Sequence, residues 1–238
     1  MALVVFQHSG REDAARLGQV LQGYGHRLRV IRRDAGQTMP PDLDDVAGVI
    51  SLGGPMNVDQ ADAYPWMAAE MDYLMAAHLA GLAVVGVCLG AQLLAAARGG
   101  GVRAMPEPEV GWHHVRLSFP GTIDPVLAGI PWNTCQFHLH GQEVAELPPG
   151  ATPLASSQKC KAQAFRIGLK TYAFQYHFEW EKADIAAFSQ DGLVARAGTS
   201  ADQIAQDAVR HYDDYRHLGD RLCENIAQLL FPIDKRWG

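Results

Sequence analysis

Short apolar runs alternate with segments of helical periodicity through the first 98 residues. The apolar runs at 2–6, 46–52 and 82–87 predict buried strands, and the alternation at 27–33 predicts a half-buried or edge strand. The intervening segments predict helices over 12–23, 65–80 and 89–98. Strands that alternate with helices favour a parallel sheet covered by helices on both faces.

The pattern changes after residue 100. Strand-like runs divided by glycine and proline turns predict added antiparallel strands, and they read VGWHHVRLSF, TCQFHLHG, CKAQAFRIG and TYAFQYHFE. Residues 180–198 and 200–230 have helical patterns, and Ser200 is the predicted N-cap of the second. We therefore expect one domain over residues 1–238, with a helical C-terminal segment from about residue 180 to the end.

Composition narrows the class of protein. With 48% hydrophobic and 19% charged residues, the chain is typical of a folded soluble protein. A net charge of −6 does not favour binding to nucleic acid or to an anionic membrane. No apolar run approaches the roughly 18 residues of a membrane helix, and the start MALVVFQHSGRED lacks the features of a signal peptide. Four cysteines without a CxxC spacing are expected to be reduced, as in the cytoplasm.

The most informative stretch is VVGVCLGAQLLAAA, residues 84–97, in which Gly86 and Gly90 flank Cys88. A nucleophile on a tight strand-to-helix turn needs small residues two positions away on either side, because the chain there folds closely on itself. The N-terminus of the following helix would favour the thiolate. Taken alone, the pattern equally fits a buried cysteine in an ordinary crossover.

Two further motifs could complete a nucleophilic site. His177 and Glu179, in FQYHFEW, are two residues apart at a predicted strand end, so their side chains share a face. There the carboxylate could orient the imidazole as a base for the thiol. The Gly53-Gly54-Pro55 turn follows a predicted parallel strand, where backbone N–H groups could stabilise an oxyanion. Each motif alone also fits a structural histidine or a plain turn.

Together, GVCLGAQLLA, SLGGPMN and YAFQYHFEW resemble the class I glutamine amidotransferases, and most closely their stand-alone, GMP-synthase-glutaminase-like members. EVGWHHVRL and FHLHGQEVAELPPGATPLASS also resemble that group, so that the likeness covers roughly residues 1–180. The resemblance implies a three-layer, flavodoxin-like α/β fold. Its sheet would be mostly parallel, with a nucleophile elbow and extra antiparallel strands.

The resemblance also implies a reaction. Cys88 would attack the γ-amide of glutamine, His177 would move protons and Glu179 would orient His177. Ammonia would leave, and water would release glutamate from a γ-glutamyl thioester. No cofactor is implied.

Five further positions match residues that contact the substrate in the family. Gly54 and Leu89 would supply oxyanion N–H groups. Gln92 would contact the substrate, and the backbone around Leu139 and Gly141 would bind the amino-acid end of glutamine.

The sequence departs from the family pattern at two positions. Phe178 stands where the family usually has proline between the histidine and the glutamate, which leaves their spacing intact. Gln142 stands where the synthase glutaminases usually have aspartate. An aspartate there could pair with the substrate's α-amino group, and a neutral glutamine would hold that cation less well. Strict preference for free glutamine is therefore not implied.

Missing motifs leave three functions open. The chain has neither a G-x-x-x-x-G-K-[ST] motif nor a Ser-Gly-Gly nucleotide loop, so ammonia would pass to a separate synthase subunit or to solvent. A stand-alone γ-glutamyl peptidase or hydrolase, and a catalytically silent regulatory module, are the alternatives.

A metal site is the remaining candidate from the sequence. The histidine pairs at 113–114 and 138–140 could be ligands. Since no carboxylate or thiol accompanies either pair at metal-site spacing, we expect no metal.

Overall fold

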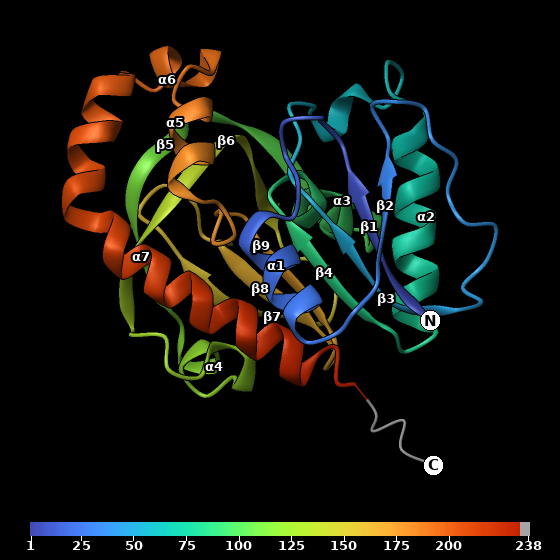
Figure 1. Ribbon diagram of the computed structural model, residues 1–238. Coiled ribbons are helices and arrows are strands. Elements are labelled where there is room, and N and C mark those ends of the chain that lie inside the picture. Colours follow the sequence, from blue (N-terminus) through green and yellow to red (C-terminus); the bar gives the residue numbers. More distant parts are fainter. Residues whose placement is uncertain (234–238) are drawn as a thin grey trace.

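The computed structural model describes residues 1–233, and a single nine-stranded sheet runs through it (Figure 1). The strand order is β2-β1-β3-β4-β9-β8-β7-β5-β6. The strands are β1 (Ala2–Gln7), β2 (Leu28–Arg32), β3 (Val46–Ser51), β4 (Ala83–Val87), β5 (Gly101–Leu117), β6 (Asn133–Glu146), β7 (Ala151–Ser156), β8 (Ala164–Ile167) and β9 (Thr171–Phe174).

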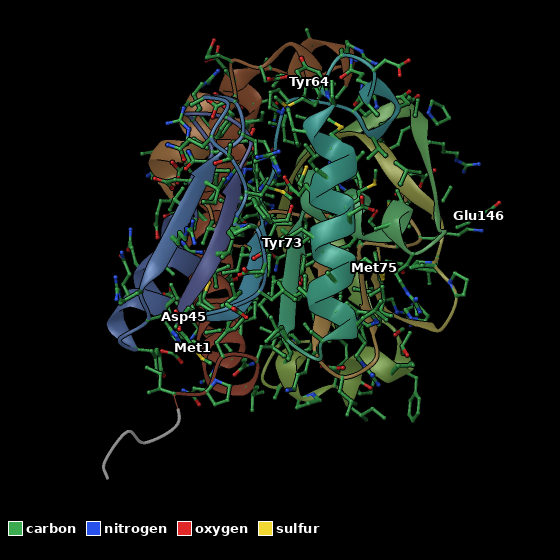
Figure 2. The ribbon with its side chains drawn as sticks, turned by 90° about the vertical axis from the view of Figure 1, so that its right-hand side faces the viewer. Met1, Asp45, Tyr64, Tyr73, Met75 and Glu146 are labelled. Atoms are coloured by element: carbon green, nitrogen blue, oxygen red, sulfur yellow. The ribbon has the colours of Figure 1, made fainter. Side chains whose placement is uncertain are left out.

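Helices cover both faces of this sheet. They are α1 (Ala15–Gly23), α2 (Trp66–Leu79), α3 (Leu89–Ala97), α4 (Phe119–Thr122), α5 (Lys182–Phe188), α6 (Gly192–Arg196) and α7 (Ala201–Leu229), with short 3₁₀ turns η1 (Val58–Gln60) and η2 (Pro125–Leu127). The helix α1 packs beside the long α7 on one face, whereas α2 packs with α3 on the other. Figure 2 shows α2 lying over the strands.

Strand β1 shows why the apolar runs are continuous. Leu3 and Val5 belong to the core cluster that contains residues of α1 and α7, whereas Val4 and Phe6 belong to the cluster beneath α2 and α3. Successive side chains of a strand point to opposite faces, and both faces of this sheet are covered. The three-layer, flavodoxin-like α/β fold expected from the sequence is confirmed.

The sheet has two halves of different direction. Strands β2, β1, β3, β4 and β9 pair in parallel, whereas β8, β7, β5 and β6 are antiparallel additions. One prediction was wrong: residues 171–174 were expected among the antiparallel strands, but β9 pairs in parallel with β4. The antiparallel β8–β9 pairing reverses the chain and brings it back alongside β4.

The C-terminal helices differ from their predicted form in one place. Residues 180–198 form two short helices instead of one, because Asp191 starts α6 by accepting a hydrogen bond from the Leu193 N–H at 2.8 Å. Ser200 caps α7 as predicted and accepts from the Gln203 N–H at 3.1 Å. The last part of the predicted helical segment, 234–238, lies outside the described residues. Within residues 1–233, no helix is long and apolar enough to cross a membrane.

Candidate active site

Cys88 lies at the sharp turn between β4 and α3, with φ of 51° and ψ of −109°. A non-glycine residue with positive φ is strained, so the surroundings must hold it there. A Cβ on Gly86 would lie 2.6 Å from the Gly90 carbonyl oxygen, and a Cβ on Gly90 would clash with the Ser51 carbonyl. The sharp strand-to-helix turn expected at Cys88 is therefore confirmed, and close backbone approach explains both glycines.

The structure brings His177 and Glu179 to this cysteine. His177 Nδ1 lies 2.7 Å from Glu179 Oε1, and the His177 side chain lines the same cavity as Cys88, which contributes to its pKa. The imidazole stacks on Trp180 with ring centroids 3.6 Å apart. His177 lies three residues beyond the end of β9, and its N–H donates to the Phe137 carbonyl at 3.0 Å. This hydrogen bond anchors the loop to β6. The side chains of His177 and Glu179 point to the same side, as their spacing predicted.

The electrostatics favour a charged imidazole. Burial acts to lower the pKa of His177, but the Glu179 carboxylate and the Cys88 thiol outweigh it and raise that pKa to about 10. His177 is therefore protonated at neutral pH beside the Cys88 sulfur. Glu179 is 1% exposed, and its second oxygen has no hydrogen-bond partner among residues 1–233, so its charge acts mainly on this ring.

The turn at Gly53-Gly54 is oriented by a histidine that the sequence reasoning missed. His8 Nδ1 donates to the Gly53 carbonyl oxygen at 3.0 Å, and His8 Nε2 lies 2.9 Å from buried Glu70. In a planar trans peptide the carbonyl and the following N–H point in opposite directions. The Gly54 N–H is therefore turned away from His8, and Gly54 lines the cavity.

A second N–H group lies at the elbow. The Leu89 N–H is at the first turn of α3, where backbone donors have no partner within the helix. Neither this N–H nor that of Gly54 donates to an acceptor among the described residues. A Cβ on Gly54 would lie 2.8 Å from both His8 and Leu89 side-chain atoms, so this position also needs glycine.

A cavity of about 410 Å³ opens above the cysteine. Among the predicted site residues, Gly54, Cys88, Leu139, Gly141 and His177 line it. The Leu139 carbonyl oxygen lies 3.9 Å from the Cys88 sulfur. The cavity is also lined by Glu12, Asn57, Asp59, Gln142, Trp180, Asp191 and Arg196.

Gln92 lies behind the cavity wall. It is 3% exposed, and its side-chain nitrogen donates to the Gln142 carbonyl oxygen and to Gln175 Oε1, each at 3.1 Å. The structure therefore does not place its amide nitrogen in the cavity, and its predicted contact with substrate stays a prediction. Gln92 does contact the strand that forms the cavity wall.

Gln142 is held by the η1 turn. Its side-chain oxygen accepts from the Val58 N–H, and its side-chain nitrogen donates to Asp59 Oδ1, each at 3.0 Å. Asp59 is exposed and lines the cavity. A carboxylate thus lies beside position 142 although the sequence has glutamine there. Sequence spacing could not reveal this contact, because 83 positions separate the two residues.

The expectation that no carboxylate accompanies the histidine pairs was wrong. Glu109 pairs with His140 across β5 and β6, so a carboxylate does join the pair His138 and His140. Ligand atoms of all three lie within 4.8 Å of one another, and each residue is at most 2% exposed. Among residues 1–233 these are the side chains that could hold a metal ion.

Contacts within this cluster hold Glu109 and His140, whereas neither ring nitrogen of His138 has a hydrogen-bond partner among residues 1–233. Burial acts to raise the pKa of Glu109, but its contacts with His140 and His138 lower it to about 2. Glu109 Oε2 lies 3.2 Å from His140 Nε2 and already accepts from the Gln163 side chain at 2.6 Å. His140 Nδ1 donates to the Gln142 carbonyl at 2.9 Å. The cluster thereby supports the strand that lines the cavity.

Comparisons with known proteins agree with the fold. The family model "Glutamine amidotransferase class-I" matches residues 15–185. The chain therefore belongs to the class I glutamine amidotransferase family. It is 30% identical over 235 residues to the glutamine amidotransferase-like protein YfeJ of Salmonella typhimurium, covering 96% of this chain and 97% of that one.

Two further proteins extend the comparison. One subunit of the glutamine-hydrolyzing GMP synthase of Thermoplasma volcanium is 31% identical over 178 residues, which cover 73% of this chain and 81% of that relative. The crystal structure of a glutamine amido transferase from Methylobacillus flagellatus superposes with a TM-score of 0.86 at 25% identity. That superposition covers 100% of this chain and 98% of the other.

Proposed function

We propose that this protein hydrolyses the γ-amide bond of glutamine or of another γ-glutamyl compound, with Cys88 as the nucleophile. One observation carries the proposal: Cys88 is held at positive φ and lines one cavity with His177, which in turn lies 2.7 Å from Glu179. A nucleophile, a base and an orienting group within hydrogen-bond reach are what nucleophilic catalysis requires.

In the first half-reaction, the Cys88 sulfur attacks the γ-carbonyl carbon. A C–S bond forms, and the N–H groups of Gly54 and Leu89 donate to the negative charge that develops on the carbonyl oxygen. The C–N bond then breaks, and His177 gives its proton to the leaving nitrogen. The products are a γ-glutamyl thioester and ammonia, or an amine if the substrate is a substituted amide.

In the second half-reaction, the neutral His177 takes a proton from water, and the water oxygen attacks the thioester carbon. The C–O bond forms, the C–S bond breaks, and glutamate leaves. Glu179 holds the imidazole in one orientation throughout. Substrate, water and these side chains account for every proton and electron pair in the two steps.

The γ-glutamyl end of the substrate would lie along β6. There the backbone at Leu139 and Gly141 lines the cavity, and Gln92 supports the strand from behind. We infer that Asp59 pairs with the α-ammonium group. The Gln142 side-chain nitrogen donates to one oxygen of this carboxylate. Asp59 would thus supply the negative charge that the family usually carries at position 142.

The fate of the nitrogen separates two versions of the proposal. By analogy with the Thermoplasma volcanium relative, which is named as one subunit of a GMP synthase, ammonia would pass to a separate synthase subunit, in the cytoplasm. A stand-alone γ-glutamyl peptidase or hydrolase is the second candidate. It is favoured by the size of the cavity, about 410 Å³, which leaves room for a larger leaving group.

A chloroketone analogue of glutamine tests the nucleophile. Cys88 should be alkylated much faster than the other three cysteines. They are poor nucleophiles because burial raises the pKa of Cys135 to about 11, that of Cys160 to about 12 and that of Cys223 well above its usual value. The variant Cys88→Ala should lose labelling and turnover, whereas the matched control Cys135→Ala should keep both. Equal alkylation of all four cysteines would exclude an activated nucleophile and favour a silent module.

A further inference from the structure

We propose that the cavity has an acidic subsite beside His177, formed by Glu12 and Asp191, which binds the leaving amine. The preferred substrates would then be γ-glutamyl amides of amines that carry a second positive charge. This inference rests on the proposed function and names the substrate class of the same site.

The position of the subsite follows from the direction of the reaction. His177 must lie next to the leaving nitrogen in order to protonate it. The γ-glutamyl part is assigned to the backbone at Leu139 and Gly141 and to Asp59. A group attached to the leaving nitrogen therefore lies near His177, in the cavity that Glu12 and Asp191 also line.

Glu12 is an unpartnered carboxylate at this point. It is 8% exposed and lines the cavity, yet its side chain forms no hydrogen bond or ion pair within residues 1–233. A Cβ on Gly53 would clash with Glu12 Oε2 and would lie 3.0 Å from His177 Cε1. The carboxylate and the imidazole edge thus pack against the same glycine. A buried charge without a partner is costly, which points to a ligand that supplies one.

A second carboxylate reinforces the first. Burial raises the pKa of Glu12, and Glu179 and Asp191 act in the same direction, while His177 and His8 oppose them. Asp191 is half-buried at the start of α6 and has no ion-pair partner among the described residues. A cation bound at Glu12 would offset the repulsion that Asp191 exerts on this carboxylate.

The other groups around the subsite do not provide that cation. The charge of His177 is taken up by Glu179 at 2.7 Å. Arg196 also lines the cavity, but it is exposed at the end of α6 and forms no ion pair with either carboxylate. Trp180 is covered by His177 on one face and stacks on Phe188, 4.3 Å between centroids, so it has no free face for a cation. Recognition would therefore come from the two carboxylates.

The test compares three synthetic amides that share the γ-glutamyl group and a four-carbon amine. The amine is 1,4-diaminobutane, butylamine or 4-aminobutyrate, so that the leaving group is cationic, neutral or anionic. We expect kcat/KM for the cationic amide to exceed that for the neutral amide by about tenfold or more, as for a charge-assisted contact. The anionic amide should be the poorest substrate of the three.

Variants assign the preference to residues. The ratio of cationic to neutral kcat/KM should fall toward one in Glu12→Gln and should also fall in Asp191→Asn. The matched control is Asp13→Asn, which removes a negative charge from the same loop at an exposed position outside the cavity. It should keep the wild-type ratio. Should Glu12→Gln not fold, Asp191→Asn still decides, because Asp191 lies at the partly exposed cavity edge and asparagine can also cap a helix.

The possible failures are distinct. Equal rates for the cationic and neutral amides, a preference for the anionic amide, or a ratio that Glu12→Gln leaves unchanged would overturn the subsite while leaving γ-glutamyl hydrolysis intact. If neither glutamine nor any of the three amides is hydrolysed and Cys88 is not labelled, the proposed function itself fails, and the subsite with it.

Discussion

Replacing Asp59 with asparagine tests how the γ-glutamyl end is recognised. The change removes one negative charge but keeps an acceptor for the Gln142 side-chain nitrogen, which lies 3.0 Å from Asp59 Oδ1. Hydrogen bonds to charged groups contribute about 1.5–3 kcal/mol, and exposed ion pairs about 1 kcal/mol or less. Since Asp59 is exposed, we expect a loss of about 1–2 kcal/mol. At 1.4 kcal/mol per factor of ten, kcat/KM should fall about 5- to 30-fold.

Two chromogenic substrates isolate the contribution of the α-ammonium group. γ-Glutamyl-4-nitroanilide carries it, whereas glutaryl-4-nitroanilide lacks it and is otherwise alike. Asp59→Asn should slow the first and leave the second little changed. The matched control Asp62→Asn removes an exposed charge just beyond η1 that does not line the cavity, and it should affect neither. An equal fall in kcat/KM for both substrates would refute pairing between Asp59 and the α-ammonium group.

Three further predictions concern the fold and the buried cluster. Gly86→Ala should destabilise the protein by about 1–3 kcal/mol in chemical denaturation, because the new Cβ would lie 2.6 Å from the Gly90 carbonyl, whereas Gly23→Ala has open space and should cost far less. The lowered pKa of Glu109 contributes stability that is present above about pH 4.5 and is lost as the pH falls toward 2. In Glu109→Gln the free energy of unfolding should therefore depend less on pH between pH 2 and 6. The same pH dependence in the variant and the wild type would contradict this. Prolonged treatment with a chelator should change neither activity nor melting temperature, and a loss that zinc restores would instead make Glu109, His138 and His140 a metal site.

The elbow and the histidine–glutamate pair were predictable because each depends on local spacing. Gly86 and Gly90 frame Cys88 within five residues, and His177 and Glu179 lie two apart. The carboxyl ends of parallel strands share one edge of the sheet, so motifs far apart in sequence meet there. Strand boundaries in the first half likewise followed from apolar runs that are buried on both faces.

Contacts that depend on register and loop path were not predictable from the sequence. Glu109 reaches His140 through a β5–β6 pairing whose register shifts between Ala104 and Glu109. The approach of Asp59 to Gln142 depends on the path of the loop after β3. The orientation of Gly53 depends likewise on the loop after β1, which carries His8. The parallel direction of β9 depends on the route of the chain through four antiparallel strands, which hydrophobic periodicity does not encode.

The central claim is that Cys88 forms a covalent γ-glutamyl intermediate. Mass spectrometry of enzyme quenched in acid during turnover of γ-glutamyl-4-nitroanilide measures it directly. We predict that the peptide containing Cys88, and no other cysteine peptide, gains the mass of one γ-glutamyl group, and that Glu179→Gln forms this adduct more slowly. Release of nitroaniline with no adduct on Cys88, or turnover retained by Cys88→Ala, would contradict the claim.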